Sequence, residues 1–492
     1  MIYINNNIFG GLDESKALIF VVDTSKIESG SSTNVQYKIP LQLKTGLYDV
    51  DCKYIIKWGD TTQSTITSSV DANLLHTYPF AGEYTIKIYP LSGASRISFF
   101  VNNLANRDRL KIREINQVGF AEIDSLYGCA NMRAFTATDF STYWNTKTDM
   151  SYMFAGWNTF NATLPSGFGN FPNATNMTGV FKGWWVYNTT LPAGFGSFAN
   201  ATNLYYTYYD WRVFNQALPS GFGNYPLAIS VSLAFQGWYA FNQALPSGLG
   251  NFPLATNVSN AFVAWFAFNQ ALPAGFGNFP LATTASWVFQ RWYAFNQTLP
   301  AGFGNFPLAT NLYAAYEQWF AFNQTLPAGF GNYPNATNID RTYYDWRVFN
   351  KALPSGFGNY PNAISVLATY ANWFAFNQSI TLTTSASLTN IAQAFHLSIF
   401  KNITISNCTN VSTINIYTFN VVPLETLIVN NLKISFTIEY STFTKTAYLD
   451  LIASLKDMTA LTSPTMTVKN VPAFDTDCDN AAAAKNWTVV KI

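Results

Sequence analysis

The sequence predicts a mainly β protein in which an N-terminal β-sandwich is followed by a solenoid of short turns, with helical or 3-10 turns between extended segments. One asparagine and one tryptophan recur together every 27 residues, as from Asn161 to Asn188, through residues 151–380. The first hundred residues lack this period and instead contain short apolar runs such as Leu18 to Val22 and Tyr84 to Ile88. Fixed periods of this size are typical of solenoids, and short alternating runs are typical of strands.

Composition excludes several classes of protein. The chain has 492 residues, of which 49% are hydrophobic, so it can build a core without disulfides or metal. Only 11% are charged and the net charge is +1, without a basic block, so we expect no binding to nucleic acid. No apolar run reaches the roughly 18 residues of a membrane span, and Met1 to Asn7 does not resemble a secretory signal. We therefore expect no membrane insertion.

Two columns define nine repeated units over residues 151–380. A unit of this size cannot bury its own apolar face, so its Phe, Leu and Trp side chains leave water only against neighbouring units. We therefore assign both columns a structural role. The tryptophans are Trp157, Trp184, Trp211, Trp238, Trp265, Trp292, Trp319, Trp346 and Trp373. The asparagines are Asn161, Asn188, Asn215, Asn242, Asn269, Asn296, Asn323, Asn350 and Asn377.

Within a unit we expect one short strand per turn. The stretch from Phe241 to Leu245 is extended and ends at Pro246, and glycines then allow the chain to turn. The stretch from Asn260 to Trp265 has aromatic residues at helical spacing and predicts a helical or 3-10 turn on the far side. Since the asparagine column has no exceptions, we expect it to point inward as a hydrogen-bonded ladder. Strand alternation then places Phe241 outside, which requires a bend.

A third column follows each tryptophan directly, and it carries the candidate binding residues. A position that accepts Phe or Arg is expected to be partly exposed, with Arg212 stacking between Trp185 and Tyr239. The column either binds sugars or a partner protein, or only covers the solenoid or packs against a neighbouring copy. Its first member is Asn158, and the candidates are Trp185, Arg212, Tyr239, Phe266, Tyr293, Phe320, Arg347 and Phe374.

The predicted β-sandwich, residues 1–100, contains a W-G-D turn that begins at Trp58, an H-T-Y run that begins at His76 and a G-x-Y-x-I strand from Gly82 to Ile86. With these motifs, roughly residues 45–90 resemble the PKD-type immunoglobulin-like domain. Thr61 stands where that family usually has glycine. The resemblance implies a spacer or adhesion module with Trp58 in the core and His76 in a structural hydrogen bond.

Three motifs mark the repeat region: Met153-Phe-Ala-Gly-Trp157, the F-N-x-x-L-P run that follows it, and Leu126-Tyr-Gly-Cys129. With these motifs the repeats resemble the BspA-like leucine-rich-repeat proteins, although Trp replaces the commoner Cys. The resemblance implies a leucine-rich-repeat-like solenoid, with irregular turns at 101–150 and irregular leucine-rich turns with a cap at 381–492. Asp475 to Trp487 is expected to form the closing helix. Such proteins include adhesins and virion or tail components.

Candidate catalytic groups are scarce. His76 and His396 are the only histidines, and Asp475, Asp477 and Asp479 lack the glycine and glutamate of a calcium loop, so they are expected to cap a helix. We expect no catalytic residue, no metal site, no cofactor and no enzymatic activity. The cysteines Cys52, Cys129, Cys408 and Cys478 are expected to be buried thiols, and Arg109, Lys111 and Arg113 the solvated face of a strand.

These features favour a structural or adhesion protein. Our first hypothesis is a virion-associated capsid decoration, fibre or tail protein at the virion surface, with other virion or surface proteins and a host glycan or receptor as partners. Whether the protein forms a homo-oligomer stays open. The alternative is a cell-surface or secreted adhesin, which predicts a longer precursor with a leader upstream of Met1. A third hypothesis is a carbohydrate-binding module of an enzyme complex.

Overall fold

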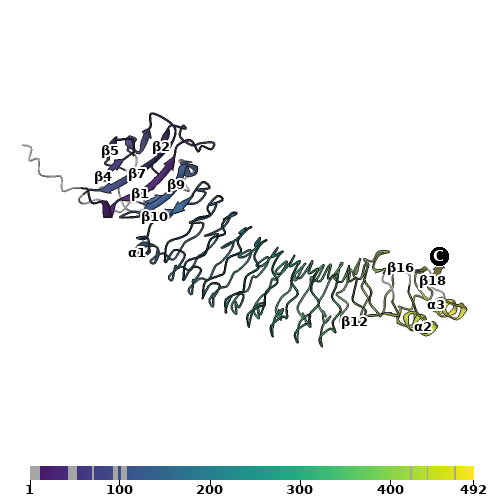
Figure 1. Ribbon diagram of the computed structural model, residues 1–492. Coiled ribbons are helices and arrows are strands. Elements are labelled where there is room, and N and C mark those ends of the chain that lie inside the picture. The colour runs from purple at the N-terminus through teal and green to yellow at the C-terminus, as the bar shows by residue number, and fades with distance from the viewer. Residues whose placement is uncertain are drawn as a thin grey trace, which may run out of the picture. The chain divides into compact units, whose positions relative to one another are not determined.

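A computed structural model describes residues 12–42, 53–68, 71–91, 98–100, 108–420, 424–439, 441–469 and 473–492 (Figure 1). The chain is mainly β, with 7% helix and 19% strand, and forms a β-solenoid of about 16 turns after an N-terminal sheet region, which confirms the predicted fold class. It divides into a first unit, residues 1–201 and 206–220, and a second unit, residues 202–205 and 221–492. The predictions for Met1 to Asn7 and Cys52 lie outside the described residues.

The N-terminal sheet is built from the predicted alternating runs. In β1 (Leu18–Asp23), Leu18, Phe20 and Val22 are fully buried. β1 pairs antiparallel with β7 (Glu83–Pro90) on one side and with β9 (Ile112–Gln117) on the other. The strands of this six-stranded sheet, in spatial order, are β11 (Ala134–Phe135), β9 (Ile112–Gln117), β1 (Leu18–Asp23), β7 (Glu83–Pro90), β4 (Tyr54–Lys57) and β5 (Gln63–Ile66).

Strand β9 also pairs with β11, in parallel orientation, and so connects the N-terminal sheet to the first turns of the solenoid. The N-terminal sheet therefore extends past residue 100, where the sequence places the end of the sandwich. Smaller sheets pair β2 (Gln36–Lys38) with β6 (Leu75–Thr77), and β8 (Ser98–Phe100) with both β3 (Leu41–Gln42) and β10 (Glu122–Ser125). The short helices are η1 (Glu14–Lys16), η2 (Ala72–Leu74), η3 (Asp108–Lys111) and α1 (Ser141–Trp144).

The W-G-D turn packs as the PKD resemblance implies. Trp58 is fully buried, and its ring stacks on that of His76 with centroids 4.6 Å apart. The Nε2 atom of His76 lies 2.8 Å from Oδ2 of Asp60, and the Tyr78 hydroxyl donates to the Trp58 main-chain oxygen at 3.1 Å. Thr61 has a φ of +73°, the left-handed conformation that favours glycine. Both Trp58 and His76 therefore serve to hold this turn.

Every tryptophan of the repeat column, Trp157 to Trp373, is fully buried. Within each unit neighbouring rings stack nearly parallel, as in Trp265 and Trp292, whose centroids lie 5.6 Å apart at 8°. The indole N–H groups from Trp265 to Trp373 also donate to a main-chain oxygen of the preceding turn, as Trp292 does to Phe262 at 2.7 Å. A buried carbonyl needs such a partner, and the cysteine that is commoner in the resembling family is only a weak donor. Burial between turns is therefore the rule throughout the repeats.

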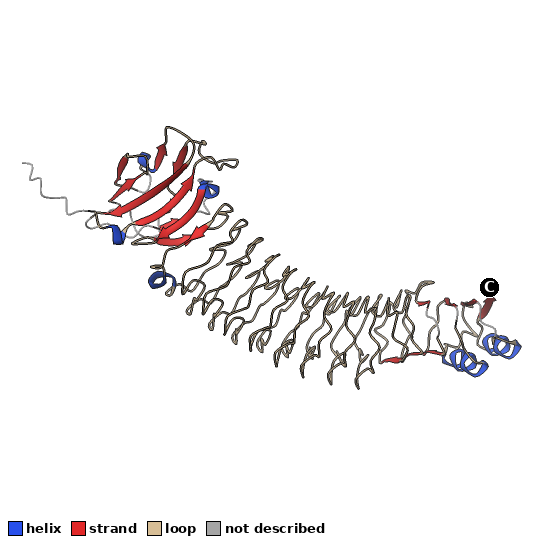
Figure 2. Cartoon of the chain, viewed as in Figure 1, coloured by secondary structure: helices blue, strands red, loops and turns tan. Residues whose placement is uncertain are grey.

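The prediction of a strand from Phe241 to Leu245 is wrong, and so is the prediction of a helical turn before each tryptophan. Residues 151–378, all of them described, contain no regular strand (tan in Figure 2). Adjacent turns instead bond through the segment before the tryptophan, where Asn260 N donates to Ser286 O at 2.9 Å and Ala264 N to Gln290 O at 2.9 Å. This segment is a chain of tight turns, with φ of +59° at Asn260 and +64° at Ala264.

Proline explains why the predicted strand does not form in the repeats. Each of the first eight repeats has a proline near the end of the extended stretch, and proline has no N–H to donate to a ladder. Thr381 occupies the place that Pro354 takes one repeat earlier, 27 residues before it (381 − 354). A strand, β12 (Ser379–Leu382), forms there and pairs parallel with β13 (Asn402–Ile405), which pairs with β15 (Thr426–Val429).

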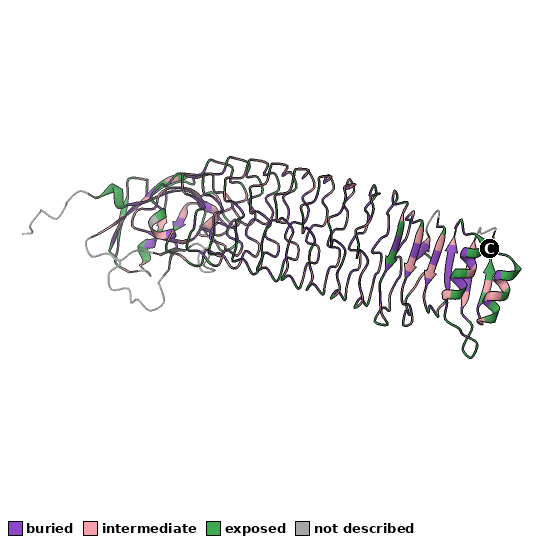
Figure 3. Ribbon diagram, turned by 90° about the horizontal axis from the view of Figure 1, so that it is seen from below, coloured by how far each residue is buried: buried purple, intermediate pink, exposed green. Residues whose placement is uncertain are grey.

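The C-terminal region closes with parallel strands and two helices (Figure 3). Asp475 caps α3 (Thr476–Ala484) by accepting from the main-chain N–H groups of Asp477 and Cys478, which confirms the predicted closing helix. Helix α2 (Lys445–Ser454) was not predicted. Thr444 caps it, and Tyr448, Leu451 and Ile452 are buried on one of its faces. The remaining strands are β14 (Phe419–Asn420), β16 (Phe436–Glu439), β17 (Thr465–Lys469) and β18 (Thr488–Lys491).

Candidate functional site

The asparagine column forms a ladder, as predicted. In the second unit, Oδ1 of Asn296 accepts from the main-chain N–H of Asn323 at 2.9 Å and from Nε2 of Gln324 at 3.1 Å. The inward orientation is wrong, since the asparagines from Asn161 to Asn377 are half-buried or exposed, whereas Phe241 and Phe295 are fully buried. The aromatic ring gains more by leaving water than the amide does, so the phenylalanine takes the inner position.

The column after each tryptophan is partly exposed, as predicted. In the second unit, four of its rings stack face to face. Their centroids lie 5.0 Å apart between Tyr239 and Phe266, 4.7 Å between Phe266 and Tyr293, and 4.6 Å between Tyr293 and Phe320. The guanidinium of Arg347 lies 4.0 Å from the centroid of the Phe320 ring and closes the row. These five side chains, Tyr239 to Arg347, are called the stacked row.

Stacking decides what the row can bind. Phe266, Tyr293 and Phe320 each have a neighbour on both faces, so only their edges reach solvent. Sugars are held against the faces of aromatic rings, where their C–H bonds meet the π-electrons. The middle of the row therefore offers an edge-on apolar surface, which suits a protein partner better than a sugar. Phe374, the last member of the column, is 47% exposed.

Two arginines of the column are held by acids within their own turn. Arg212 makes two hydrogen bonds to Asp210, at 3.0 and 2.7 Å, and Arg347 makes two to Asp345, at 2.9 and 3.1 Å. Such paired contacts fix the plane of the guanidinium. In the first unit this plane lies over the Trp185 ring, 4.5 Å from its centroid, which confirms the predicted contact between Arg212 and Trp185. Tyr239 belongs to the second unit.

A groove of about 390 Å³ lies in the first unit beside this column. Its side-chain lining includes Arg109, Tyr127, Asn158, Lys182, Trp185 and Asp210. Its floor contains Gly128, Gly156 and Gly183, which stand one residue before Cys129, Trp157 and Trp184. Sequence reasoning missed the groove, although its signal is present. These consecutive turns all have glycine where most later ones have a side chain, such as Asp210, Ala264 or Arg291, and Asn158 has no ring at its position in the third column.

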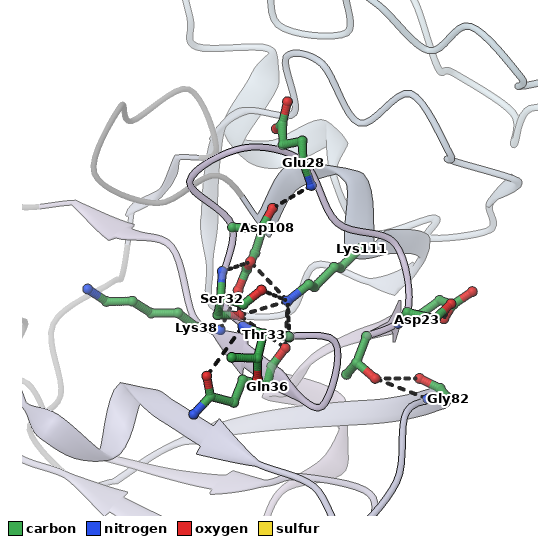
Figure 4. A network of polar contacts seen from close by, with 12 residues as sticks. Asp23, Glu28, Ser32, Thr33, Gln36, Lys38, Gly82, Asp108 and Lys111 are labelled. Carbon is green, nitrogen blue, oxygen red and sulfur yellow. Dashed lines mark hydrogen bonds and ion pairs between the residues drawn. The ribbon is translucent and has the colours of Figure 1, made fainter.

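The prediction that Arg109, Lys111 and Arg113 form a solvated face is wrong. Lys111 is fully buried, because it ends the helical turn η3 and does not follow the alternation of β9. Its ammonium lies 3.1 Å from Asp108 and donates to the main-chain oxygens of Thr33 at 2.9 Å and Gln36 at 2.7 Å (Figure 4). Burial lowers the pKa of Lys111 despite the attraction of Asp108.

The neighbouring arginines are also engaged. Arg109 makes hydrogen bonds to both carboxylate oxygens of Glu28, at 2.7 and 3.0 Å. Arg113 donates to the main-chain oxygen of Asn131 at 2.7 Å. Arg109 and Lys111 therefore tie η3 to residues 28–36, and the pair with Glu28 positions Arg109 at the edge of the groove.

Among the remaining reactive groups, the described cysteines are buried and His396 is half-buried. Cys129, Cys408 and Cys478 are free and buried, and burial raises the pKa of Cys408 to about 12. Burial also lowers the pKa of His396, whose Nδ1 has no hydrogen-bond partner in the described structure. Within the described ranges, no group of three or more His, Cys, Asp or Glu side chains is arranged to hold a metal ion. No helix in those ranges is both long and apolar enough to cross a membrane.

No protein-family model, curated protein or solved structure matches this chain. The resemblances to PKD-type domains and to BspA-like repeats therefore rest on the sequence motifs, since a solenoid is not specific to either family. Function has to follow from the stacked row and the groove.

Proposed function

We propose that this protein is a non-enzymatic structural protein that displays its solenoid for contact with a host surface, as a capsid decoration, fibre or tail component of a virion. The main support for this proposal is that the hydrogen bond from the buried tryptophan to a main-chain oxygen recurs from turn to turn. Trp292 donates to Phe262 O and Trp319 donates to Phe289 O, both at 2.7 Å. Repeated core contacts hold surface positions at a fixed spacing, which suits display more than the placement of one reactive atom.

The acids of the repeats support this proposal, because they are used to hold surface arginines. Asp345 fixes Arg347, and Glu317 lies 2.5 Å from Arg341. Glu317 is almost fully buried, so this pair is shielded from water on the side of the acid. Arginines held in one plane contribute to recognition at protein interfaces.

The stacked row is the expected contact for another virion or surface protein. Aromatic residues and arginine are enriched at the centres of protein interfaces, and rings already stacked lose little freedom on binding. A second copy of this chain is one such partner. A carbohydrate-binding module of an enzyme complex is the weaker hypothesis for this row, because the ring faces are covered.

Location and contact can be tested together. Antibody labelling of native particles and of the producing cells should place the protein on the particle surface. Label confined to a cell envelope, together with a cleaved leader found by mass spectrometry of the native N-terminus, would instead support the adhesin. Replacing Tyr239, Phe266 and Tyr293 by alanine should release the protein from its assembly or abolish attachment to host cells. Leu254, Leu281 and Leu308, exposed in another column of the same turns, provide the matched alanine control.

A further inference from the structure

Trp185 begins the ring column of the first unit, and one of its faces is free. The Arg212 guanidinium covers the face toward the following turn, at 4.5 Å from the ring centroid. The preceding turn has Asn158 at this position, which has no ring to stack. No aromatic ring among the described residues stacks on Trp185, and 38% of the Trp185 surface is exposed. The uncovered face therefore borders the groove that Asn158 also lines.

The polar groups beside this face converge on Gly183. A Cβ atom built there would lie 3.4 Å from Oδ1 of Asn158 and 3.7 Å from Nε1 of Trp185. Gly183 and Gly156 both have a φ of +78°, which side chains rarely adopt. The backbone thus forms an open floor, with an amide and an indole N–H at its edge. Pockets for small ligands combine such an apolar wall with a few fixed polar groups.

The charges of the groove favour an anion. Asp210 is paired with Arg212, and Arg109 is paired with Glu28, so these ion pairs are internally neutral. The Lys182 ammonium lies 4.2 Å from the centroid of the Tyr206 ring and 5.3 Å from that of Tyr209. No carboxylate of the described residues lies within ion-pair distance of it. Lys182 is therefore the cation that a bound carboxylate can neutralise.

We propose that this groove binds an acidic sugar. The C–H face of the pyranose ring packs on the free face of Trp185, the sugar carboxylate pairs with Lys182, and hydroxyl groups hydrogen-bond to the Asn158 amide. This inference rests on the proposed contact with host surfaces and gives that contact a ligand class. It also separates two roles of one column, since the rings of the stacked row are covered and Trp185 is not.

The test is a calorimetric titration of the full-length protein with the methyl glycoside of glucuronic acid and, in parallel, with methyl glucoside. The acidic glycoside should bind and the neutral one should bind at least tenfold more weakly. Trp185→Ala and Lys182→Gln should each weaken binding of the acidic glycoside at least tenfold. Phe80→Ala removes an exposed ring that belongs neither to the column nor to the groove, and should leave binding unchanged.

A second variant blocks the free face of Trp185 while Trp185 and Lys182 both stay in place. Asn158→Trp places a ring against the free face of Trp185 and should abolish binding while the protein stays folded by circular dichroism. Equal binding of both glycosides, binding that survives Lys182→Gln or Asn158→Trp, or no binding at all would overturn the proposal. Particle labelling that persists in those cases would leave the display function intact, so the two failures are distinguishable.

Discussion

The indole nitrogen of Trp292 donates to the main-chain oxygen of Phe262 over 2.7 Å, and so joins two turns of the solenoid. The two rings on either side of it in the column, Trp265 and Trp319, have centroids 5.6 and 5.7 Å away. One side chain thus supplies both the buried area and the hydrogen bond that link adjacent turns. The structural role of the column follows from these two contributions together.

Replacing Trp292 by phenylalanine should strongly destabilise the solenoid. The change removes part of a fully buried ring and leaves the Phe262 carbonyl without its donor. Together these losses should cost about 2–4 kcal/mol, measured as the shift in urea unfolding. Tyr293→Phe, at the half-exposed next position, should cost less than about 0.5 kcal/mol. Similar costs for both variants would contradict the role assigned to the column.

Two glycines of one turn should respond differently to alanine. Gly329 and Gly331 have similar φ values, +81° and +79°, but a Cβ at Gly331 would lie 2.2 Å from Cδ2 of Phe357, whereas one at Gly329 meets nothing within 4 Å. Gly329→Ala should cost about 1–2 kcal/mol for the left-handed backbone, and Gly331→Ala about 1–3 kcal/mol more for the overlap. Thermal unfolding of the two variants makes the comparison, and equal stability would refute the tight packing of Phe357.

The asparagine ladder should tolerate aspartate better than alanine. Oδ1 of Asn296 accepts two hydrogen bonds from the next repeat, and aspartate keeps that oxygen. Asn296→Ala should therefore cost about 1–2 kcal/mol and Asn296→Asp clearly less. The difference should appear as faster amide hydrogen exchange at Asn323 in the alanine variant alone. Unchanged exchange at Asn323 would show that the asparagine ladder does not contribute to stability.

Stability should fall between neutral pH and mildly acidic pH because of His396. Burial holds its folded-state pKa below the ordinary value of 6.5, so the unfolded chain takes up a proton first as the pH falls. The contribution of neutral His396 to the free energy of unfolding is therefore complete above pH 6.5, and it is lost as the pH falls toward the folded-state pKa. His396→Gln should flatten this part of the curve of unfolding midpoint against pH. Asp60 and Asp71, whose pKa values are lowered from 3.8, act only in a more acidic range.

The sequence reveals the period, the buried tryptophans and the exposed third column, because each depends on one residue type recurring in register. It misplaces the strand, since alternation around Asn242 is overridden by the proline that follows and by the burial of Phe241. Lys111 is misassigned because η3 shifts the chain by a helical turn just before β9. The groove depends on a missing ring at Asn158 and a small residue at Gly183, and absences of that kind gain meaning only in three dimensions.

Consecutive turns bury one another's apolar side chains, so the register between turns matters more for stability than the number of turns. Deleting residues 266–292 removes one full repeat of 27 residues (292 − 266 + 1) and joins equivalent positions. The shortened protein should keep its circular dichroism spectrum and unfold cooperatively. Deleting only residues 266–278, about half a repeat, should abolish that transition. A full-repeat deletion that fails to fold, or a half-repeat deletion as stable as the intact chain, would contradict the account.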